Sequence, residues 1–196
     1  METSSLIIRR AHTAEDFEAG LGLLNLQYQK AFGVIPSPPE YLFVAWNGPS
    51  IVGTIGVNAW NPDTGLRLAN LYRFNHQETP LPVEQEATVE FARWTAISRG
   101  TSCALLCAAV KFSCELGKRY VWCEQVASIS RIYRRFGVIL HWIEAAVRND
   151  AFIEPCHQAY YDSNTVDFLM FELSQALAAL TEYLAVHDIA VEYALG

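Results

Sequence analysis

The chain has 196 residues, of which 52% are hydrophobic and 12% aromatic, and it carries a formal net charge of −7. This length and composition fit one domain with a large core and exclude a disordered chain, and the acidic balance opposes nucleic-acid binding. No apolar run reaches the ~18 residues of a transmembrane helix, and the first residues lack a signal-peptide pattern, so we expect a cytoplasmic protein with no transmembrane segment.

Strands and helices are predicted along the whole chain. Aromatic and β-branched runs predict strands over residues 5–10, 41–46, 51–60, 66–74, 88–98, 120–126, 138–147 and 165–173. Apolar residues at helical spacing predict helices over residues 14–32, 101–116, 128–136 and 175–186. This order is not a strict βαβ alternation, so it indicates an α+β fold with a mixed sheet and helices on its faces.

Caps and breakers set the limits of these elements. Thr13 and Ser128 are candidate N-caps, and Gly117 and Gly137 are candidate helix stops. Residues 33–39 carry three prolines and are expected to form a loop, because proline removes backbone donors and restricts its neighbour. Residues 75–86 are polar and contain two prolines, which is typical of an exposed loop.

Charged residues are distributed unevenly. Residues 93–135 carry eight basic and two acidic side chains, a net charge of +6, so the rest of the chain carries −13. A basic region within an acidic protein indicates an anion-binding role. Only 18% of the residues are charged, which points either to apolar surface for a ligand, a partner or a homodimer, or simply to a large core.

The five cysteines do not form a secreted disulfide framework, because their number is odd and their spacing irregular. Cys103, Cys107 and Cys114 recur at helical spacing with no histidine close in sequence. Three thiolates could bind a metal, but a buried thiol face on a helix is favoured, so we expect no metal site. His76, His141 and His157 are isolated from any motif and are interpreted as structural or exposed.

The start of the helix predicted at residue 101 is a candidate phosphate site. The free N–H groups of a first helical turn and the positive end of the helix dipole bind phosphate, and small residues allow it to approach the main chain. Gly100, Thr101 and Ser102 are small, and Arg99 adds a charge. An ordinary capped helix has the same pattern, so the alternative stays open.

Three segments resemble the GNAT acyltransferases. Residues 99–104 (RGTSCA) resemble the acyl-donor loop Gln/Arg-x-x-Gly-x-Gly/Ala, with Ser102 where the family prefers glycine. Residues 130–138 resemble the family's LYxRxGF helix and turn, and residues 51–55 (IVGTI) resemble its third strand. The resemblance covers residues 6–173 in order. It implies a single GNAT-like domain over residues 1–196, with a mixed, mostly antiparallel twisted sheet flanked by helices on both faces and a helical extension over residues 174–196.

A narrower resemblance lies in residues 90–94 (EFARW), which are similar to the E-x-S-R-F signature of acyl-homoserine-lactone (autoinducer) synthases, a branch to which N-acyl amino acid synthases are similar. The chain departs from the lactone synthases because it has Pro38-Pro39-Glu40-Tyr41 where they have paired aspartates. It also has Gly56 where they usually place an arginine. These departures disfavour S-adenosylmethionine as the acceptor and favour a different amine, such as an amino acid.

The resemblance also implies roles for residues. Glu90 is the expected general base and Tyr133 the expected donor to the leaving sulfur, although a salt bridge from Glu90 to Arg93 and a packed aromatic are the alternatives. Strand alternation places Glu90 and Arg93 on opposite faces, so only a bulge would bring them together. The main-chain N–H near Ile97 is the expected oxyanion donor, and the expected donor-binding residues are Ile97, Arg99, Gly100, Thr101, Ser102, Cys103 and Ala104.

The acyl chain and the carrier have candidate residues too. Arg131, Arg134 and Arg135 are expected to dock an acidic acyl carrier protein, or else to form a solvated helix face. The acyl-chain or acceptor pocket is expected to be lined by Arg93, Trp94, Phe112, Trp122 and Trp142. We therefore expect an N-acyltransferase that moves a long acyl group from acyl carrier protein to an amino acid. It is expected to have no permanently bound cofactor. The alternatives are a conventional GNAT enzyme using short acyl-CoA and a non-catalytic module that binds acyl-CoA or acyl carrier protein.

Overall fold

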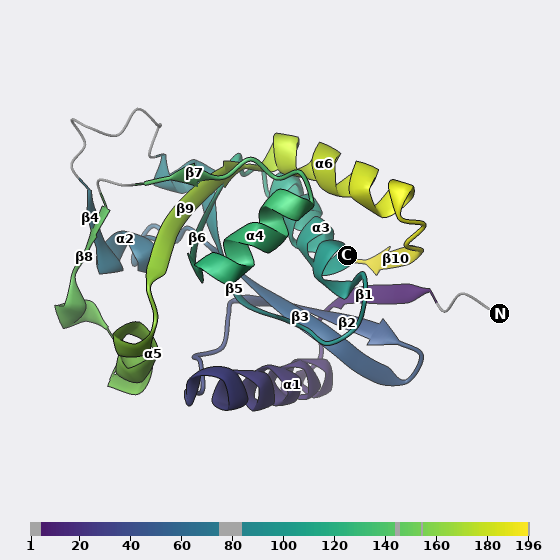
Figure 1. Cartoon of the computed structure of the whole chain (residues 1–196), viewed down its shortest axis with the longest axis horizontal. Helices are drawn as coiled ribbons and strands as arrows, with labels where there is room; N and C mark the ends of the chain where they lie inside the picture. The colour runs from purple at the N-terminus through teal and green to yellow at the C-terminus, as the bar shows by residue number, and fades with distance from the viewer. Residues whose placement is uncertain (1–4, 75–83, 144–145, 154, 196) are drawn as a thin grey trace.

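The computed structural model describes residues 5–74, 84–143, 146–153 and 155–195. Its centre is an eight-stranded sheet in the order β10-β1-β2-β3-β5-β6-β9-β7, in which neighbouring strands are antiparallel except for β10–β1 and β5–β6 (Figure 1). The strands are β1 (Leu6–Arg10), β2 (Tyr41–Asn47), β3 (Ser50–Ala59), β5 (Thr88–Ala96), β6 (Tyr120–Val126), β7 (His141–Trp142), β9 (Val166–Glu172) and β10 (Val191–Ala194). The sheet is mixed and mostly antiparallel, as predicted.

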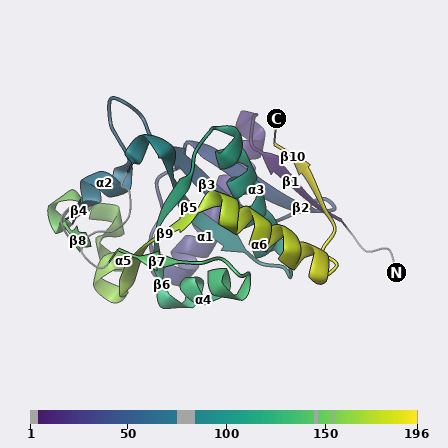
Figure 2. The same ribbon diagram turned by 90° about the horizontal axis from the view of Figure 1, so that it is seen from above.

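Helices cover both faces of this sheet. Helix α1 (Ala14–Phe32) packs on one face, and α3 (Thr101–Glu115) with α6 (Leu173–Val186) covers the other (Figure 2). Consecutive residues of β2 show the alternation: Leu42 packs against Gly20 of α1, whereas Phe43 packs on Phe112 of α3 with ring centroids 5.2 Å apart. The main apolar core therefore lies between the sheet, α3 and α6.

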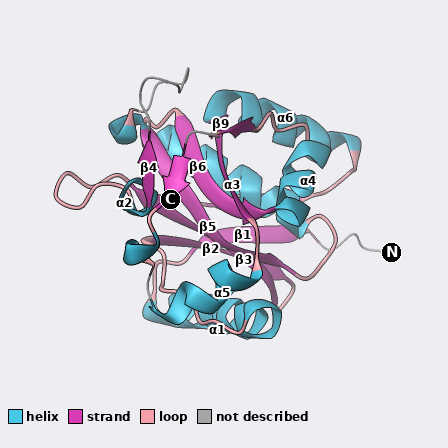
Figure 3. Ribbon diagram, turned by 60° about the vertical axis from the view of Figure 1, so that its left-hand side comes forward, coloured by secondary structure: helices cyan, strands magenta, loops and turns pink. Residues whose placement is uncertain are grey.

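A second, smaller apolar core adjoins β6 and β9. It is built by α2 (Arg67–Leu71), β4 (Tyr72–Phe74), β8 (Ala146–Arg148) and α5 (Gln158–Ser163), and β4 and β8 pair antiparallel. Tyr72 stacks on Phe168 of β9 at 4.5 Å, and Trp122 of β6 is fully buried beside them. Helix α5 also contacts the end of α1, where Phe32 meets Tyr160 at 5.0 Å (Figure 3). This unit forms one wall of the site described below.

Strands β5 and β6 separate from each other. Their parallel pairing is confined to Thr88–Glu90 against Tyr120–Trp122, although both strands continue further. On its other side β5 pairs with β3, and the register shifts there because β5 contains an extra residue at Arg93, whose φ is 55°. This is a β-bulge, which bends a strand and leaves part of the ladder unpaired. The sheet therefore opens between β5 and β6.

Most predicted elements are confirmed, and Thr13 caps α1 by accepting a hydrogen bond from the Asp16 N–H at 3.1 Å. The strand predicted over residues 66–74 is wrong in its first half, where α2 forms, and the strand predicted over residues 138–147 is reduced to the short β7 and the start of β8. Helix α4 (Ala127–Arg135) begins after Val126 with no side-chain cap, so Ser128 is not its N-cap. Residues 75–83, most of the predicted exposed loop, lie outside the described residues.

The C-terminal segment differs from the predicted helical extension. Residues 174–186 are helical, but β10 then pairs parallel to β1 and completes the edge of the sheet. Parallel pairing with a strand from the other end of the chain is not visible in local sequence patterns. None of the helices in the described part of the chain is long and apolar enough to span a membrane.

Gly53→Ala tests how tightly β3 packs beside the start of α3. A Cβ at Gly53 would lie 2.7 Å from the Thr95 carbonyl oxygen and from the Thr101 side chain, so backbone has to shift. We expect a loss of about 1–3 kcal/mol in the free energy of unfolding, measured by urea denaturation. Gly22→Ala is the matched control, because no atom lies within 4 Å of its added Cβ on α1. Equal stabilities of the two variants would contradict the packing described here.

Candidate functional site

Two adjoining pockets lie where β5 and β6 separate. The first, about 640 Å³ with its opening, is the carboxylate pocket, lined by Tyr28, Val34, Pro36, Arg67, Leu68, Glu90, Phe91, Ala92, Arg93, Glu124, His157, Tyr160 and Tyr161. The second, about 510 Å³ with its opening, is the splay pocket, lined by Tyr28, Phe32, Phe91, Ala92, Arg93, Trp94, Cys123, Glu124, Gln125, Val126, Ile129, Tyr133 and Tyr160. The two share a wall, so ligands in each could meet.

Glu90 is the buried carboxyl of the first pocket. It is the last residue of β5 that pairs with β6, is 2% exposed, and accepts a hydrogen bond from the Leu68 N–H. Burial raises the pKa of Glu90 to about 7, against the opposing effects of the Leu68 N–H, the Arg67 charge, the Asn58 side chain and the Arg93 charge. A carboxyl that titrates near neutral pH can accept and release a proton during a reaction.

The bulge in β5 brings Arg93 to the same pocket as Glu90. Simple alternation would place them on opposite faces, but the extra residue changes the direction of the side chains beyond it. Arg93 is 7% exposed, and its guanidinium donates to the Ser37 carbonyl at 2.7 Å and to the Ser37 hydroxyl at 2.6 Å. The proline-rich loop before β2 thus holds this cation in the wall of both pockets.

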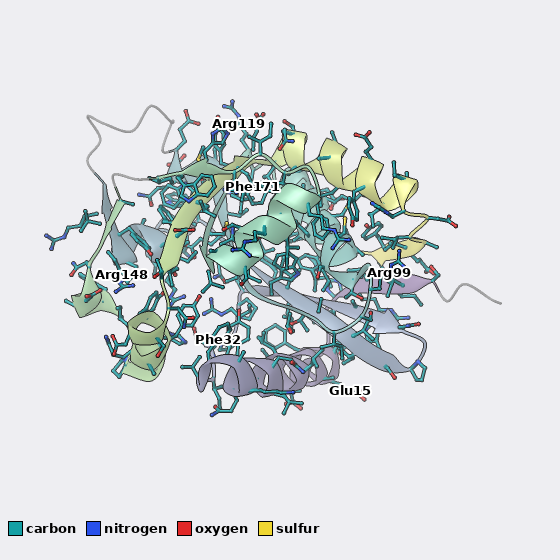
Figure 4. The ribbon with its side chains drawn as sticks, in the orientation of Figure 1. Glu15, Phe32, Arg99, Arg119, Arg148 and Phe171 are labelled. Carbon is teal, nitrogen blue, oxygen red and sulfur yellow. The ribbon has the colours of Figure 1, made fainter. Side chains whose placement is uncertain are left out.

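Sequence patterns did not identify Glu124 as a site residue. It lies on β6, is half-buried, and lines both pockets. Its carboxylate accepts hydrogen bonds from the Tyr72 hydroxyl at 2.7 Å and the Tyr161 hydroxyl at 2.8 Å. Burial raises the pKa of Glu124, opposed by these two bonds and by the charges of Arg67 and Arg148. The half-buried Arg148 side chain marks this end of the molecule in Figure 4.

His157 is also brought to the site, although its sequence neighbours form no motif. It is 6% exposed and lines the carboxylate pocket, and its Nδ1 lies 3.5 Å from Arg67 Nη2. His141, in contrast, is exposed on β7, and His76 lies outside the described residues. Only the folding of α2 and α5 against β6 places Arg67 and His157 together, so no local signal could have found them.

Tyr133 and Trp94 form the far end of the splay pocket. Tyr133 of α4 is 2% exposed, and its ring meets Trp94 edge-to-face at 5.1 Å. Burial raises the pKa of Tyr133 well above its usual value, so the phenol stays protonated and can donate. Phe32 extends from the end of α1 toward the same pocket (Figure 4).

The oxyanion donor predicted at Ile97 is wrong. The Ile97 N–H donates to the Val52 carbonyl at 2.9 Å, so it belongs to the sheet, and its side chain is 54% exposed. The bulge offers a different amide. Burial raises the pKa of Tyr28, and the charge of Arg93 and a hydrogen bond from the Trp94 main chain oppose this effect. The Trp94 N–H therefore faces Tyr28, which lines both pockets.

The other residues of the predicted donor loop surround the start of α3. Gly100 has φ 81° and is the N-cap, while Thr101, Cys103 and Ala104 lie on the buried side of the first turn of α3. Ser102 and Arg99 reach the surface, and Arg99 lies at the opposite end of the molecule from Arg148 in Figure 4. Their binding of a donor remains a prediction. Cys107 is buried beside Cys103, and Cys114 is half-buried, as expected for a thiol face on a helix.

Three of the aromatic residues predicted to line the acyl-chain pocket lie elsewhere. Phe112 packs on Tyr41 and Phe43 across the sheet, and Trp122 is buried in the second core. Trp142 is 40% exposed, and the Arg134 guanidinium lies 4.5 Å from its ring centroid. The prediction failed for these residues because the sequence does not show to which side of the sheet each aromatic side chain points. Of this set, Trp94 and Arg93 line the splay pocket.

The remaining sequence predictions concern the surface and the loop before β2. Arg131, Arg134 and Arg135 are exposed along α4, as a docking surface requires. At Gly56, a Cβ would lie 2.6 Å from the Pro39 side chain. The packed proline therefore leaves no room for the arginine that lactone synthases usually place there.

The raised pKa of Glu90 makes stability depend on pH. The proton is held more tightly in the folded chain than in the unfolded one, so its stabilising effect is complete below the ordinary glutamate pKa and is lost as the pH rises toward 7. We expect the unfolding free energy of Glu90→Gln, relative to that of the wild type, to rise by roughly 3 kcal/mol from pH 4 to pH 8. Urea denaturation at each pH measures it. Glu18→Gln, an exposed carboxyl on α1, is the control. A difference between variant and wild type that does not change with pH would show that the pKa of Glu90 is not raised.

No known family profile matches the chain. No curated protein sequence matches it either. Its structure is similar to that of BjaI, a CoA-dependent acyl-homoserine lactone synthase solved with SAM and isopentyl-CoA, with a TM-score of 0.64 and 13% identity over 96% of this chain and 93% of BjaI. It is also similar to the lactone synthase LasI, with a TM-score of 0.61 and 12% identity over 91% of this chain and 96% of LasI.

A third similar structure is FeeM, an N-acyl amino acid synthase from uncultured soil microbes, with a TM-score of 0.56 and 14% identity over 91% of this chain and 99% of FeeM. All three likenesses extend over almost the whole of both chains. At these identities they define the architecture and not the substrate. The chain therefore has the GNAT-like fold of the acyl-homoserine lactone and N-acyl amino acid synthases.

Proposed function

We propose that this protein is an N-acyltransferase that moves an acyl group from a phosphopantetheine thioester to the amine of a small acceptor, an amino acid. One observation carries the proposal. The opening between β5 and β6 joins a pocket containing a carboxyl with a pKa of about 7 to a pocket ending at a protonated phenol. Aminolysis of a thioester needs a base for the amine and an acid for the sulfur.

The splay pocket is the site we assign to the thioester. Unpaired strand edges on both sides can bind an extended pantetheine arm by main-chain hydrogen bonds, and Phe91, Trp94 and Ile129 supply apolar surface. The Trp94 N–H in the bulge is the candidate donor to the oxygen of the tetrahedral intermediate, which would replace Tyr28 as its acceptor. Tyr133 is the candidate donor of the proton that the sulfur takes as the carbon–sulfur bond breaks.

The carboxylate pocket is the site we assign to the acceptor. Arg67 and Arg93 supply positive charge for an acceptor carboxylate, and the walls formed by Val34, Pro36 and Tyr160 suit an apolar side chain. Glu90 takes one proton from the ammonium, and the free amine attacks the thioester carbonyl. The nitrogen–carbon bond forms, the carbon–sulfur bond breaks, and the second nitrogen proton replaces the one that Tyr133 donates to sulfur.

An acyl carrier protein is the donor we favour, because α4 exposes a basic face beside the splay pocket and carrier proteins are acidic. Acyl-CoA is the second candidate, and the likeness to the CoA-dependent BjaI favours it. The lack of space at Gly56 argues against an acceptor bound as the lactone synthases bind theirs.

The test is to express the chain in a bacterial host and to compare small-molecule extracts by mass spectrometry with those from cells expressing Glu90→Gln. New N-acyl amines in the wild type alone identify both the acyl chain and the acceptor. Purified protein is then assayed with that acceptor and with matched acyl-CoA and acyl-carrier-protein donors. Tight donor binding without transfer to any amine would leave a non-catalytic binding module as the better description.

Glu90→Gln is expected to keep the fold and donor binding and to lower kcat at least about tenfold, since a positioned base contributes about 10²–10⁴ in rate. The wild-type kcat/KM should rise with pH through about 7 as Glu90 loses its proton, and this limb should be absent in the variant. The loss should shrink at higher pH, where the ammonium loses its proton without help from the enzyme. Near-normal turnover of the variant across this range would show that Glu90 is structural.

Reversing charge on α4 tests carrier docking. Arg131→Glu with Arg135→Glu should raise the apparent KM for an acyl-carrier-protein donor, with a weaker effect at high salt, because screening reduces steering between charged surfaces. Arg134 is kept because it packs on Trp142. Arg9→Glu with Lys30→Glu is the control, since it changes net charge equally at exposed positions on β1 and α1. Equal KM values for the two double variants would exclude this docking surface.

A further inference from the structure

Glu124 lies at the boundary between the two pockets. It lines both of them, whereas Glu90 lines the carboxylate pocket alone. Strand β6 carries Glu124 beyond Trp122, the last residue paired with β5, so its side chain belongs to the part of the strand that has separated. Of the two carboxyls, Glu124 is therefore the one at the place where a thioester in the splay pocket and an acceptor in the carboxylate pocket would meet.

Two hydroxyl groups fix this carboxylate. Tyr72 of β4 donates to Oε1 and Tyr161 of α5 donates to Oε2, at 2.7 and 2.8 Å. A carboxylate offers about four acceptor positions in all, so each oxygen keeps a position for a further donor. Because the two tyrosines come from different elements, the orientation of the carboxylate is set before any ligand enters.

Among the residues that the structure describes, no basic side chain forms an ion pair with Glu124, although Arg67 lines the same pocket. Arg119 pairs with Glu84, and Arg148, which is half-buried, donates to Asp150 at 2.6 Å. The charges of Arg67 and Arg148 oppose the rise in the pKa of Glu124. A half-buried carboxylate that has hydrogen bonds but no ion-pair partner gains most from a cation that brings its own donors.

We propose that Glu124 binds the ammonium group of the acceptor and positions its nitrogen beside the thioester, while Glu90 accepts the proton. The proposal rests on the proposed function, because it requires the carboxylate pocket to be the acceptor pocket. Tyr28, Tyr160 and Tyr161 line the same pocket and offer aromatic rings to a cation. The acceptor is thus recognised as a cation, and an alcohol of the same shape should bind less well.

The test compares 2-phenylethylamine with 2-phenylethanol, which match in shape but differ in charge. Binding of each to the whole chain is measured by isothermal titration calorimetry at pH 7.5 without any acyl donor. We expect the wild type to bind the amine at least about tenfold more tightly, as a hydrogen bond between charged groups provides. Glu124→Gln keeps hydrogen bonding to both tyrosines and should remove the preference. Glu172→Gln, an exposed carboxyl at the end of β9, should retain it.

Kinetics provide a second measurement once an acceptor is known. Glu124→Gln should raise the KM for the acceptor at least about tenfold and leave the KM for the acyl donor unchanged. If Glu124 is purely structural, the substitution should lower the melting temperature and change neither KM. Glu124→Asp, which keeps the charge on a shorter side chain, should recover part of the acceptor affinity.

Equal affinity of the wild type for the amine and the alcohol, or no binding of the amine, overturns the proposal whether or not the variants fold. Retained preference in Glu124→Gln overturns it as well. The binding experiment needs no turnover, so its outcome separates the two hypotheses. Amine preference without acyl transfer would remove the proposed function and keep Glu124 as a cation site. Transfer without amine preference would remove only the role of Glu124.

Discussion

The parallel ladder between β5 and β6 ends at the pair formed by Glu90 and Trp122. Up to that point the two strands satisfy each other's backbone groups, and beyond it their edges face an opening instead. The bulge at Arg93 increases the separation, because an extra residue bends its strand away from the regular ladder. Both pockets, and the side chains that line them, depend on this interruption.

The interruption is supported from outside the strands. On one side, the proline-rich loop fixes Arg93 through Ser37, and α1 supplies Tyr28 and Phe32. On the other side, the second apolar core presses α2 and α5 against β6, where the two tyrosine hydroxyls reach Glu124. Burying carboxyls in this way costs stability, as the raised pKa values of Glu90 and Glu124 show. Sites built for proton transfer commonly accept this cost.

Local patterns in the sequence predicted most of the fold. The regular period of α1 and the turn between β2 and β3 are local properties, so the sequence predicts them well. Glu90 was predicted as a site residue because a five-residue segment resembles a known signature, and Tyr133 because a helix and turn do. The element order also agrees with a GNAT-like sheet.

Features that depend on distant residues could not be predicted. The bulge at Arg93 is defined only by its register against β3, and alternation alone gave the opposite face. Glu124, Arg67 and His157 converge from a strand and two helices, with no shared motif. Trp122 and Phe112 looked like pocket walls because residue type alone does not reveal which core a side chain joins. The sequence-based oxyanion donor failed because a hydrogen bond to β3 already uses that amide.

The C-terminal strand has a practical consequence for anyone who trims or fuses this chain. Between α6 and β10 the turn places Ile189 against Gly100, where an added Cβ would lie 3.1 Å from the isoleucine side chain. The last residues therefore brace the loop that opens α3, and Leu195 is itself buried. Cutting after α6 would expose the edge of β1 to other strands and loosen that loop at the same time. A tag is better joined through a spacer after residue 196. A domain boundary placed at the end of the last helix would remove β10 and its contacts.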